Sequence, residues 1–166
     1  MDKRSHNSSK SSKKQKDTLL KAFSIIRYFV KPANQKEFED NKLAMIVELI
    51  KCAQILNNAR STTLQESLYS MNTIKVFRVC LIDRNQQIRE NTIKLFRYMM
   101  NNKEILKMYR KQGIYIFVSK IVEKDPNRDT MQEIIEAIKF IRRWIVVDSS
   151  SFPKLLANSL VALAEA

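Results

Sequence analysis

Apolar residues recur every three or four positions along most of the chain, and this spacing predicts amphipathic helices. The segment from about 35 to 58 has an apolar face made of Leu43, Ile46, Val47, Ile50, Ala53 and Ile55. The same spacing continues near residues 19–30, 64–81, 88–100, 105–108, 114–122 and 131–147. Because short polar turns separate these segments, we expect seven or eight helices.

Capping and turn residues indicate where several of these helices begin and end. Thr63 and Glu66 match the spacing of a capping box, which predicts a helix start. Gly113 should separate two helices, because glycine ends helices readily. The serines at 149–151 are expected to cap the last helix, with Pro153 near its first turn. Residues 114–118 have strand-like composition but no partner strand, so they too are predicted to be helical.

The segment 131–147 is expected to pack against its neighbours through one stripe of isoleucines. These are Ile134, Ile138, Ile141 and Ile145. Trp144 lies three positions after Ile141, so it is interpreted as a core residue, with Arg142 and Arg143 on the outer face.

A short pattern of apolar and basic residues occurs three times. It reads T-I-K-V-F-R-V at 73–79, T-I-K-L-F-R-Y at 92–98 and I-K-F-I-R-R-W at 138–144. Matched at their Ile-Lys pairs, which begin at 93 and 138, the last two copies are 45 positions apart, which fits a HEAT or armadillo unit of roughly 40–47 residues. We therefore predict an all-α fold, an α-solenoid of HEAT/armadillo-like repeats, with a compact helical bundle as the alternative.

Composition supports helices and divides the chain into two parts. Hydrophobic residues make up 45% of the chain, and there is one glycine, so turns typical of hairpins and barrels are scarce. Residues 1–16 contain one hydrophobic residue, the initial Met, and are expected to be a disordered basic tail rich in Ser and Lys. Residues 17–166 are expected to form the helical repeat domain, as the start of a longer solenoid.

The sequence offers no catalytic constellation. His6 is the one histidine and lies in the predicted tail, which argues against histidine-based acid–base or nucleophilic catalysis. A single glycine provides no phosphate-cradling loop. Cys52 and Cys80 have no neighbouring Cys or His at metal-ligand spacing, so both are interpreted as buried apolar residues. We expect no enzyme activity, catalytic residues, cofactor or small-molecule substrate.

Two carboxylate pairs have the spacing of one helical turn. They are Glu37 with Asp40, and Glu133 with Glu136. Because no third ligand is nearby, both pairs are interpreted as solvated helix faces and no metal site is expected.

The net charge of +13 raises the question of a polyanionic partner. The aromatic residues have the spacing of helix cores, which argues against a platform for stacking RNA bases. The candidate interaction surface instead consists of basic residues in the repeated pattern, because arginine is enriched in protein interfaces. These candidates are Lys94, Arg97, Lys139, Arg142 and Arg143.

Two segments resemble the N-terminal region of the Rictor family, also known as pianissimo. The first is C-L-I-D-R-N-Q-Q-I-R-E-N-T-I-K-L-F-R-Y at 80–98, where Asp83 is expected to cap a helix and pair with Arg89. The second covers 138–164, where a basic helix leads into S-F-P at 151–153 and then N-S-L at 158–160. The similarity extends over about residues 61–166.

The resemblance implies a non-catalytic scaffold or regulatory subunit of TOR complex 2, acting in TOR signalling. Its implied partners are TOR kinase and the other subunits of that complex, with outputs that include actin organisation and growth signalling. The implied location is cytoplasmic, with peripheral association at the plasma membrane through the complex. No segment has the run of roughly 18 apolar residues that a membrane span needs.

Two other functions fit the same pattern of helices. One is a generic HEAT/armadillo adaptor that binds another protein, such as transport cargo, in its groove. The other is a basic helical protein that binds nucleic acid. The salt dependence of binding distinguishes the nucleic-acid function from the others. Affinity that depends on phosphate contacts falls steeply as the salt concentration rises, whereas affinity that depends on apolar contacts does not.

Overall fold

The computed structural model describes residues 35–59 and 71–165, together with five isolated positions before residue 25. Within these residues every regular element is a helix, which confirms the all-α class. The predicted tail, the helix near residues 19–30 and the capping box of Thr63 and Glu66 lie outside the described residues, apart from those isolated positions.

The helices follow one another through short connections. In chain order they are α2 (Gln35–Ala59), α4 (Met71–Arg78), the 3-10 turn η2 (Val79–Ile82), α5 (Gln86–Met99), α6 (Lys103–Gln112), α7 (Ile114–Val122), α8 (Met131–Asp148), the 3-10 turn η3 (Ser149–Ser151) and α9 (Lys154–Glu165). The predicted helices at 35–58, 88–100, 114–122 and 131–147 are confirmed with small differences at their ends.

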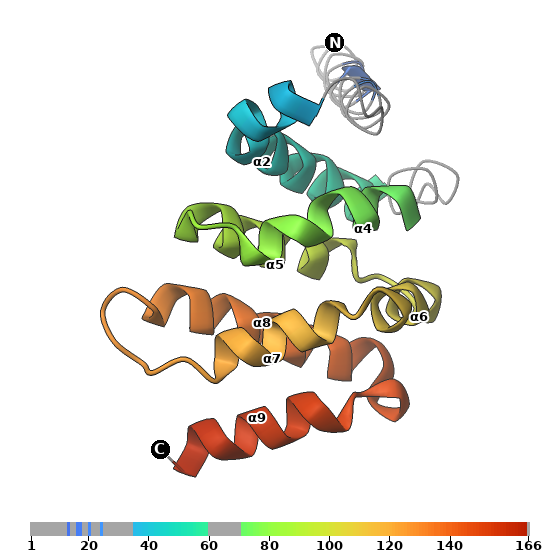
Figure 1. Cartoon of the computed structure of the whole chain (residues 1–166). Coiled ribbons are helices and arrows are strands. Elements are labelled where there is room, and N and C mark those ends of the chain that lie inside the picture. The colour runs from blue at the N-terminus through green and yellow to red at the C-terminus, as the bar shows by residue number, and fades with distance from the viewer. Residues whose placement is uncertain are drawn as a thin grey trace, which may run out of the picture.

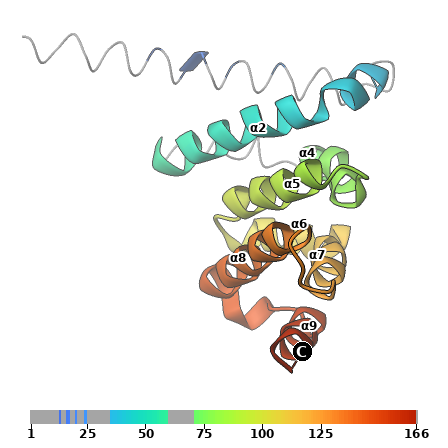
Figure 2. The ribbon, with the colours of Figure 1, turned by 90° about the vertical axis from the view of Figure 1, so that its left-hand side faces the viewer.

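The helices form two layers along the length of the molecule (Figures 1 and 2). In one layer α2, α5 and α8 stack in that order, and α5 contacts both of the others. In the other layer α7 packs against α9, while α4 contacts α6 and η2. The hydrophobic core lies between the layers and continues from Phe38 in α2 to Leu156 in α9.

Hydrogen bonds and ion pairs between stacked helices join residues that are separated by similar numbers of positions along the chain. Lys42 in α2 reaches Asp83 beside α5, 41 residues away, and Asn57 reaches the Tyr98 carbonyl, also 41 away. Arg89 in α5 reaches Glu133 in α8, 44 residues away. Each stacked helix is therefore tied to the next one by residues about one predicted repeat apart.

The last two copies of the repeated pattern lie on α5 and α8, which are neighbours in the stack. The apolar pair is buried in both copies, as Leu95 and Phe96 in α5 and as Phe140 and Ile141 in α8. The first copy begins on α4, in the other layer. The pattern therefore marks two helices in equivalent positions and one that is not equivalent.

The predicted inward stripe of α8 is wrong at two of its four positions. Ile134 and Ile141 are buried, but Ile138 is 39% exposed and Ile145 is 43% exposed. Because α8 packs between α5 and α7, its buried face also includes Ala137 one residue before Ile138. A shift of one residue turns a side chain by about 100° around a helix, which brings Ile138 and Ile145 to the surface.

A cluster of aromatic rings joins α5, α6 and α8. Tyr109 in α6 lies 5.4 Å from Phe96, 6.0 Å from Phe140 and 6.3 Å from Trp144, measured between ring centroids. The Tyr109 hydroxyl donates to the Phe96 carbonyl at 2.6 Å, and the Trp144 indole donates to the Ser151 hydroxyl at 3.2 Å. Trp144 is fully buried, which confirms its interpretation as a core residue.

Local polar groups begin and end the helices. The Asn85 side chain caps α5 by accepting from the Gln87 amide at 2.9 Å, and Asn102 caps α6 by accepting from the Ile105 amide at 3.0 Å. The expectation that Asp83 caps α5 is wrong. Asn85 is the capping residue, and the Asp83 carboxylate accepts from the Asn85 amide, which precedes the first helical residue.

The predicted cap of the last helix is also wrong. Residues 149–151 form the turn η3, and α9 begins after Pro153, whose carbonyl accepts from the amides of Leu156 and Ala157. Ser151 is instead engaged with Trp144 and with the Asp148 carbonyl. The serines therefore stabilise the connection between α8 and α9.

Replacing Gly113 by Ala should lower the free energy of unfolding by about 1–2 kcal/mol, because a left-handed backbone disfavours any Cβ. Gly113 joins α6 to α7 with φ of 66°. A Cβ there would lie 3.4 Å from the Ile116 side chain, an ordinary contact, so the penalty comes from the backbone. Urea denaturation should show a smaller loss for Gly113→Asn, since Asn tolerates this conformation better. Equal losses would contradict the backbone explanation.

Candidate interaction site between α5 and α8

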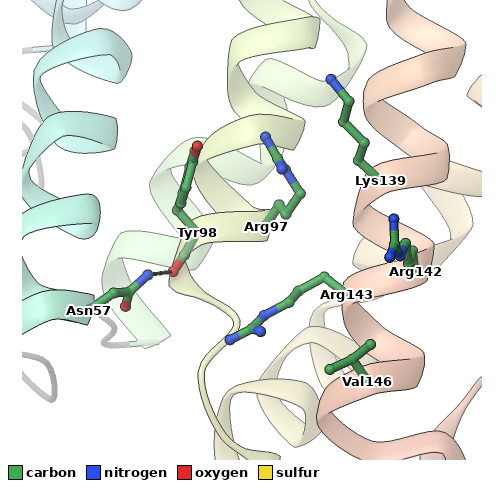
Figure 3. A pocket seen from close by; sticks show the side chains of 7 residues that line it. All are labelled: Asn57, Arg97, Tyr98, Lys139, Arg142, Arg143 and Val146. Atoms are coloured by element: carbon green, nitrogen blue, oxygen red, sulfur yellow. Dashed lines mark hydrogen bonds between the residues drawn. The ribbon is translucent and has the colours of Figure 1, made fainter.

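An open pocket of about 460 Å³ lies where the end of α2 meets α5 and α8 (Figure 3). We call it the basic pocket. Its lining residues are Asn57, Arg97, Tyr98, Lys139, Arg142, Arg143 and Val146. Four of the five residues proposed as an interaction surface therefore line one pocket. Lys94 does not line it, although it lies one turn before Arg97 on α5.

The wall between α5 and α8 is built around a buried carboxylate. Glu136 is 7% exposed at its side chain and accepts from Lys139 at 2.7 Å and from Arg97 at 3.3 Å. The Arg97 guanidinium also lies 4.8 Å from the centroid of the Tyr98 ring, a cation–π contact. The Arg97 Nε atom is buried and has no hydrogen-bond partner among the described residues. The fold therefore holds Arg97 in place but leaves part of its donor capacity unused.

The other two arginines differ in how they are held. Arg143 extends from α8 toward α5, where its Nε donates to the Met100 carbonyl at 2.9 Å (Figure 3). Met100 ends α5, so this bond also satisfies a carbonyl at the helix terminus. Arg142 is exposed, and no hydrogen bond or ion pair joins it to the described part of the chain. Its guanidinium is thus available to a ligand.

The three basic residues of α8 share one face of the helix with Val146. Their numbers, 139, 142, 143 and 146, follow the i, i+3, i+4, i+7 spacing that brings side chains together on a helix. Asn57 closes the opposite side by donating to the Tyr98 carbonyl at 2.8 Å. The pocket therefore combines a cationic helix face with a polar rim.

A second cluster of charges lies at the other end of the α5–α8 contact. Glu133 has a fully buried side chain and accepts from Arg89 at 2.6 and 2.9 Å and from Lys124 at 2.9 and 3.0 Å. Burial alone would raise the pKa of Glu133, but the hydrogen bonds from Arg89 and Lys124 outweigh it and lower that pKa.

The interpretation of Glu133 and Glu136 as a solvated pair is therefore wrong. The i, i+3 spacing of two carboxylates on a helix does not show whether they are exposed or buried. Glu133 can be buried because Arg89 and Lys124 donate to it, and these cations lie 44 and 9 residues away along the chain. Glu37 and Asp40, the other pair, are exposed as expected.

The expected ion pair between Asp83 and Arg89 is also wrong. The Asp83 carboxylate pairs with Lys42 of α2 at 2.5 Å, whereas Arg89 donates to the backbone carbonyl of Asp83 at 2.7 Å. Burial would raise the pKa of Asp83, but the hydrogen bonds from Lys42 and the Asn85 amide, together with the positive charges of Lys42 and Arg89, outweigh it and lower that pKa. Asp83 therefore connects α2 to the start of α5.

The two cysteines and the carboxylates of the described residues were the remaining candidates for a reactive or metal-binding group. Both cysteines are buried, and burial raises the pKa of the Cys80 thiol to about 12, which opposes formation of the reactive thiolate. Among the described residues no three His, Cys, Asp or Glu side chains come together in a way that could hold a metal ion. In the same part of the chain no helix is long and apolar enough to cross a membrane.

The described residues thus define a helical protein of stacked layers whose distinctive surface is a basic pocket. The chain belongs to the family described as "Rapamycin-insensitive companion of mTOR, N-term", whose sequence profile matches residues 46–166. The expected family is therefore confirmed.

Two curated relatives carry the name "Rapamycin-insensitive companion of mTOR". The mouse protein is 24% identical and the human protein 23% identical, each over 86 residues. Those residues are 52% of this chain and 5% of each relative, so the chain spans a small part of the length of the proteins it matches. No solved structure matches significantly.

Proposed function

We propose that this chain is the N-terminal helical part of a scaffold or regulatory subunit of TOR complex 2. The observation that carries the proposal is the family match, which covers residues 46–166. The names of the mouse and human relatives describe companions of mTOR, and this supports TOR kinase as a partner of the present chain. A scaffold acts through its surfaces, so this role requires no catalytic residue.

The stacking of the helices supports an α-solenoid of HEAT/armadillo-like repeats as the form of that scaffold. α2, α5 and α8 occupy equivalent places in one layer, and the Ile-Lys pair at 93–94 returns 45 positions later, at 138–139, on the next stacked helix. Such stacks present long continuous surfaces on which partners dock. The partners proposed here are TOR kinase and the other subunits of the complex, in the cytoplasm and, through the complex, at the plasma membrane.

The test is affinity purification of the tagged full-length product from its own cells, after nuclease treatment, with mass spectrometry of the retained proteins. TOR kinase should be retained with the parent protein. A variant with Ile141→Asp, which is expected to unfold the described helices, provides the control and should retain less of the partners that bind this region. Retention of karyopherins or coat proteins without TOR kinase would overturn the proposal and favour a generic adaptor.

A further inference from the structure

We propose that the basic pocket binds a phosphorylated side chain on a segment of a partner protein. The inference goes beyond the scaffold role, since it names what one surface recognises. It rests on the geometry of the pocket and not on the assignment to TOR complex 2, so an experiment that contradicts one of the two proposals leaves the other standing.

The charge of the pocket fits a dianion. Its lining contains four cationic side chains, and the one carboxylate of the described residues that pairs with any of them is Glu136, which Arg97 and Lys139 share. The remaining positive charge is therefore largely uncompensated. A phosphorylated side chain has a charge of about −1.5 to −2 at neutral pH and three acceptor oxygens, which arginine forks bind in pairs.

The donors are arranged before any ligand arrives. Arg143 is fixed by its bond to the Met100 carbonyl, and Lys139 and Arg97 are fixed by Glu136. Lys139, Arg142 and Arg143 are all exposed, but Arg142 is the one of the four without a bond to the described part of the chain. Preorganised donors lose little conformational entropy on binding, and Arg142 can complete the site without breaking an existing contact.

The apolar wall favours a protein segment over a free phosphate. Val146 is 68% exposed and lies on the same helix face as Lys139 and Arg142, and Tyr98 supplies a half-buried ring. A phosphate ion has no apolar group that could pack against Val146 or Tyr98, whereas the residues beside a phosphorylated side chain can supply one. The volume of about 460 Å³ also lies within the roughly 300–1,000 Å³ typical of ligand pockets.

The same geometry disfavours a membrane or a nucleic acid as the ligand. Arg97 is only 22% exposed at its side chain and lies between helices, so a flat lipid surface would not reach it. Single-stranded nucleic acids bind through rows of exposed aromatic rings. Tyr98 is the one aromatic residue that lines the pocket, and the Arg97 guanidinium already covers its ring.

The experiment uses the 166-residue chain and fluorescence anisotropy in about 0.15 M salt, near physiological ionic strength. The probe is a fluorescein-labelled degenerate peptide library with a central phosphothreonine and apolar residues on both sides. A second library contains threonine at the centre. The phosphorylated library should bind at least about tenfold more tightly, because bonds between arginine and a charged acceptor are strong.

Arg142→Glu should weaken binding of the phosphorylated library by about tenfold or more. The matched control is Arg128→Glu, which makes the same change of charge at an exposed arginine in the connection before α8. It should leave binding nearly unchanged. Both variants should show the circular dichroism melting curve of the parent, since both side chains are exposed.

Three outcomes would overturn the inference. The first is equal binding of the two libraries, and the second is an equal loss in the Arg142 and Arg128 variants. The third comes from competition: displacement of the peptide at similar concentration by inorganic phosphate, by phosphatidylserine vesicles or by poly-U would assign the pocket to that ligand instead. Retention of the peptide against all three competitors would support it.

Discussion

Replacing Ile141 by Asp should prevent the helices from holding their folded arrangement. Ile141 is 1% exposed and lies on the face of α8 that packs against its neighbours. An aspartate there would be a buried charge with no partner, which costs roughly 4 kcal/mol or more. Because domains of this size are stable by only about 5–15 kcal/mol, circular dichroism should show a melting transition that is greatly lowered or lost.

Ile138→Asp is the matched control for this prediction. It makes the same chemical change three residues earlier on the same helix, but at a side chain that is 39% exposed. The carboxylate can remain in water, so the variant should melt close to the parent. Lys139→Asp should also stay folded, with a small loss because it adds a second carboxylate near Glu136. Equal destabilisation by Ile138→Asp and Ile141→Asp would show that the orientation of α8 is wrong.

The second large effect is expected at Glu133. Glu133→Gln keeps the shape of the side chain but removes the charge that Arg89 and Lys124 surround. We expect a loss of about 3 kcal/mol, the lower end of the range for a broken buried pair, because both cations retain some access to water. Urea denaturation at neutral pH measures this loss. Glu104→Gln, at an exposed pair within α6, is the control and should change little.

The same variant should change how stability depends on pH. The pKa of Glu133 is lower in the folded protein than its ordinary value of 4.5. The unfolded chain therefore takes up its proton first, and the contribution of Glu133 is complete above pH 4.5 and is lost as the pH falls through the lower folded value. Between pH 6 and pH 3.5 the parent should lose more stability than Glu133→Gln. Parallel pH profiles would contradict a charged Glu133 in the folded state.

The helices themselves could be predicted from the sequence, because their signals are local. The apolar spacing predicted a helix near residues 88–100, and the apolar residues Ile88, Leu95, Phe96, Met99 and Met100 of that segment are all buried. Gly113 was predicted to separate two helices and adopts the left-handed backbone that suits glycine. Periodicity and turn chemistry depend on residues close in the chain, which is why these predictions succeeded.

The orientation of α8 and its charged contacts could not be predicted in the same way. An isoleucine at 138 fits an amphipathic stripe as well as an alanine at 137, and only the positions of α5 and α7 decide between them. Glu133 likewise has the spacing of a surface carboxylate until Arg89 is brought from 44 residues away. Interactions between helices depend on packing that periodicity does not contain.

The sequence predicted a basic interaction surface but not a pocket, and its role in binding stays a prediction. The repeated pattern pointed to Arg97, Lys139, Arg142 and Arg143, which do line one pocket. It also pointed to Lys94, which does not, and it missed Asn57 from the end of α2, Tyr98 and Val146. The pattern identifies basic residues at equivalent places on stacked helices, but it carries no information about the preceding helix that closes the pocket.

The regular separation of 39–44 residues between bonded partners in the α2–α5–α8 stack has a consequence for the folding of this chain. Each helix finds its neighbour after closing only one loop of moderate length, so the entropy lost at each step is small. Units that touch only their neighbours can also fray from one end. Hydrogen exchange should therefore be slowest in α5, which has a stacked partner on both sides.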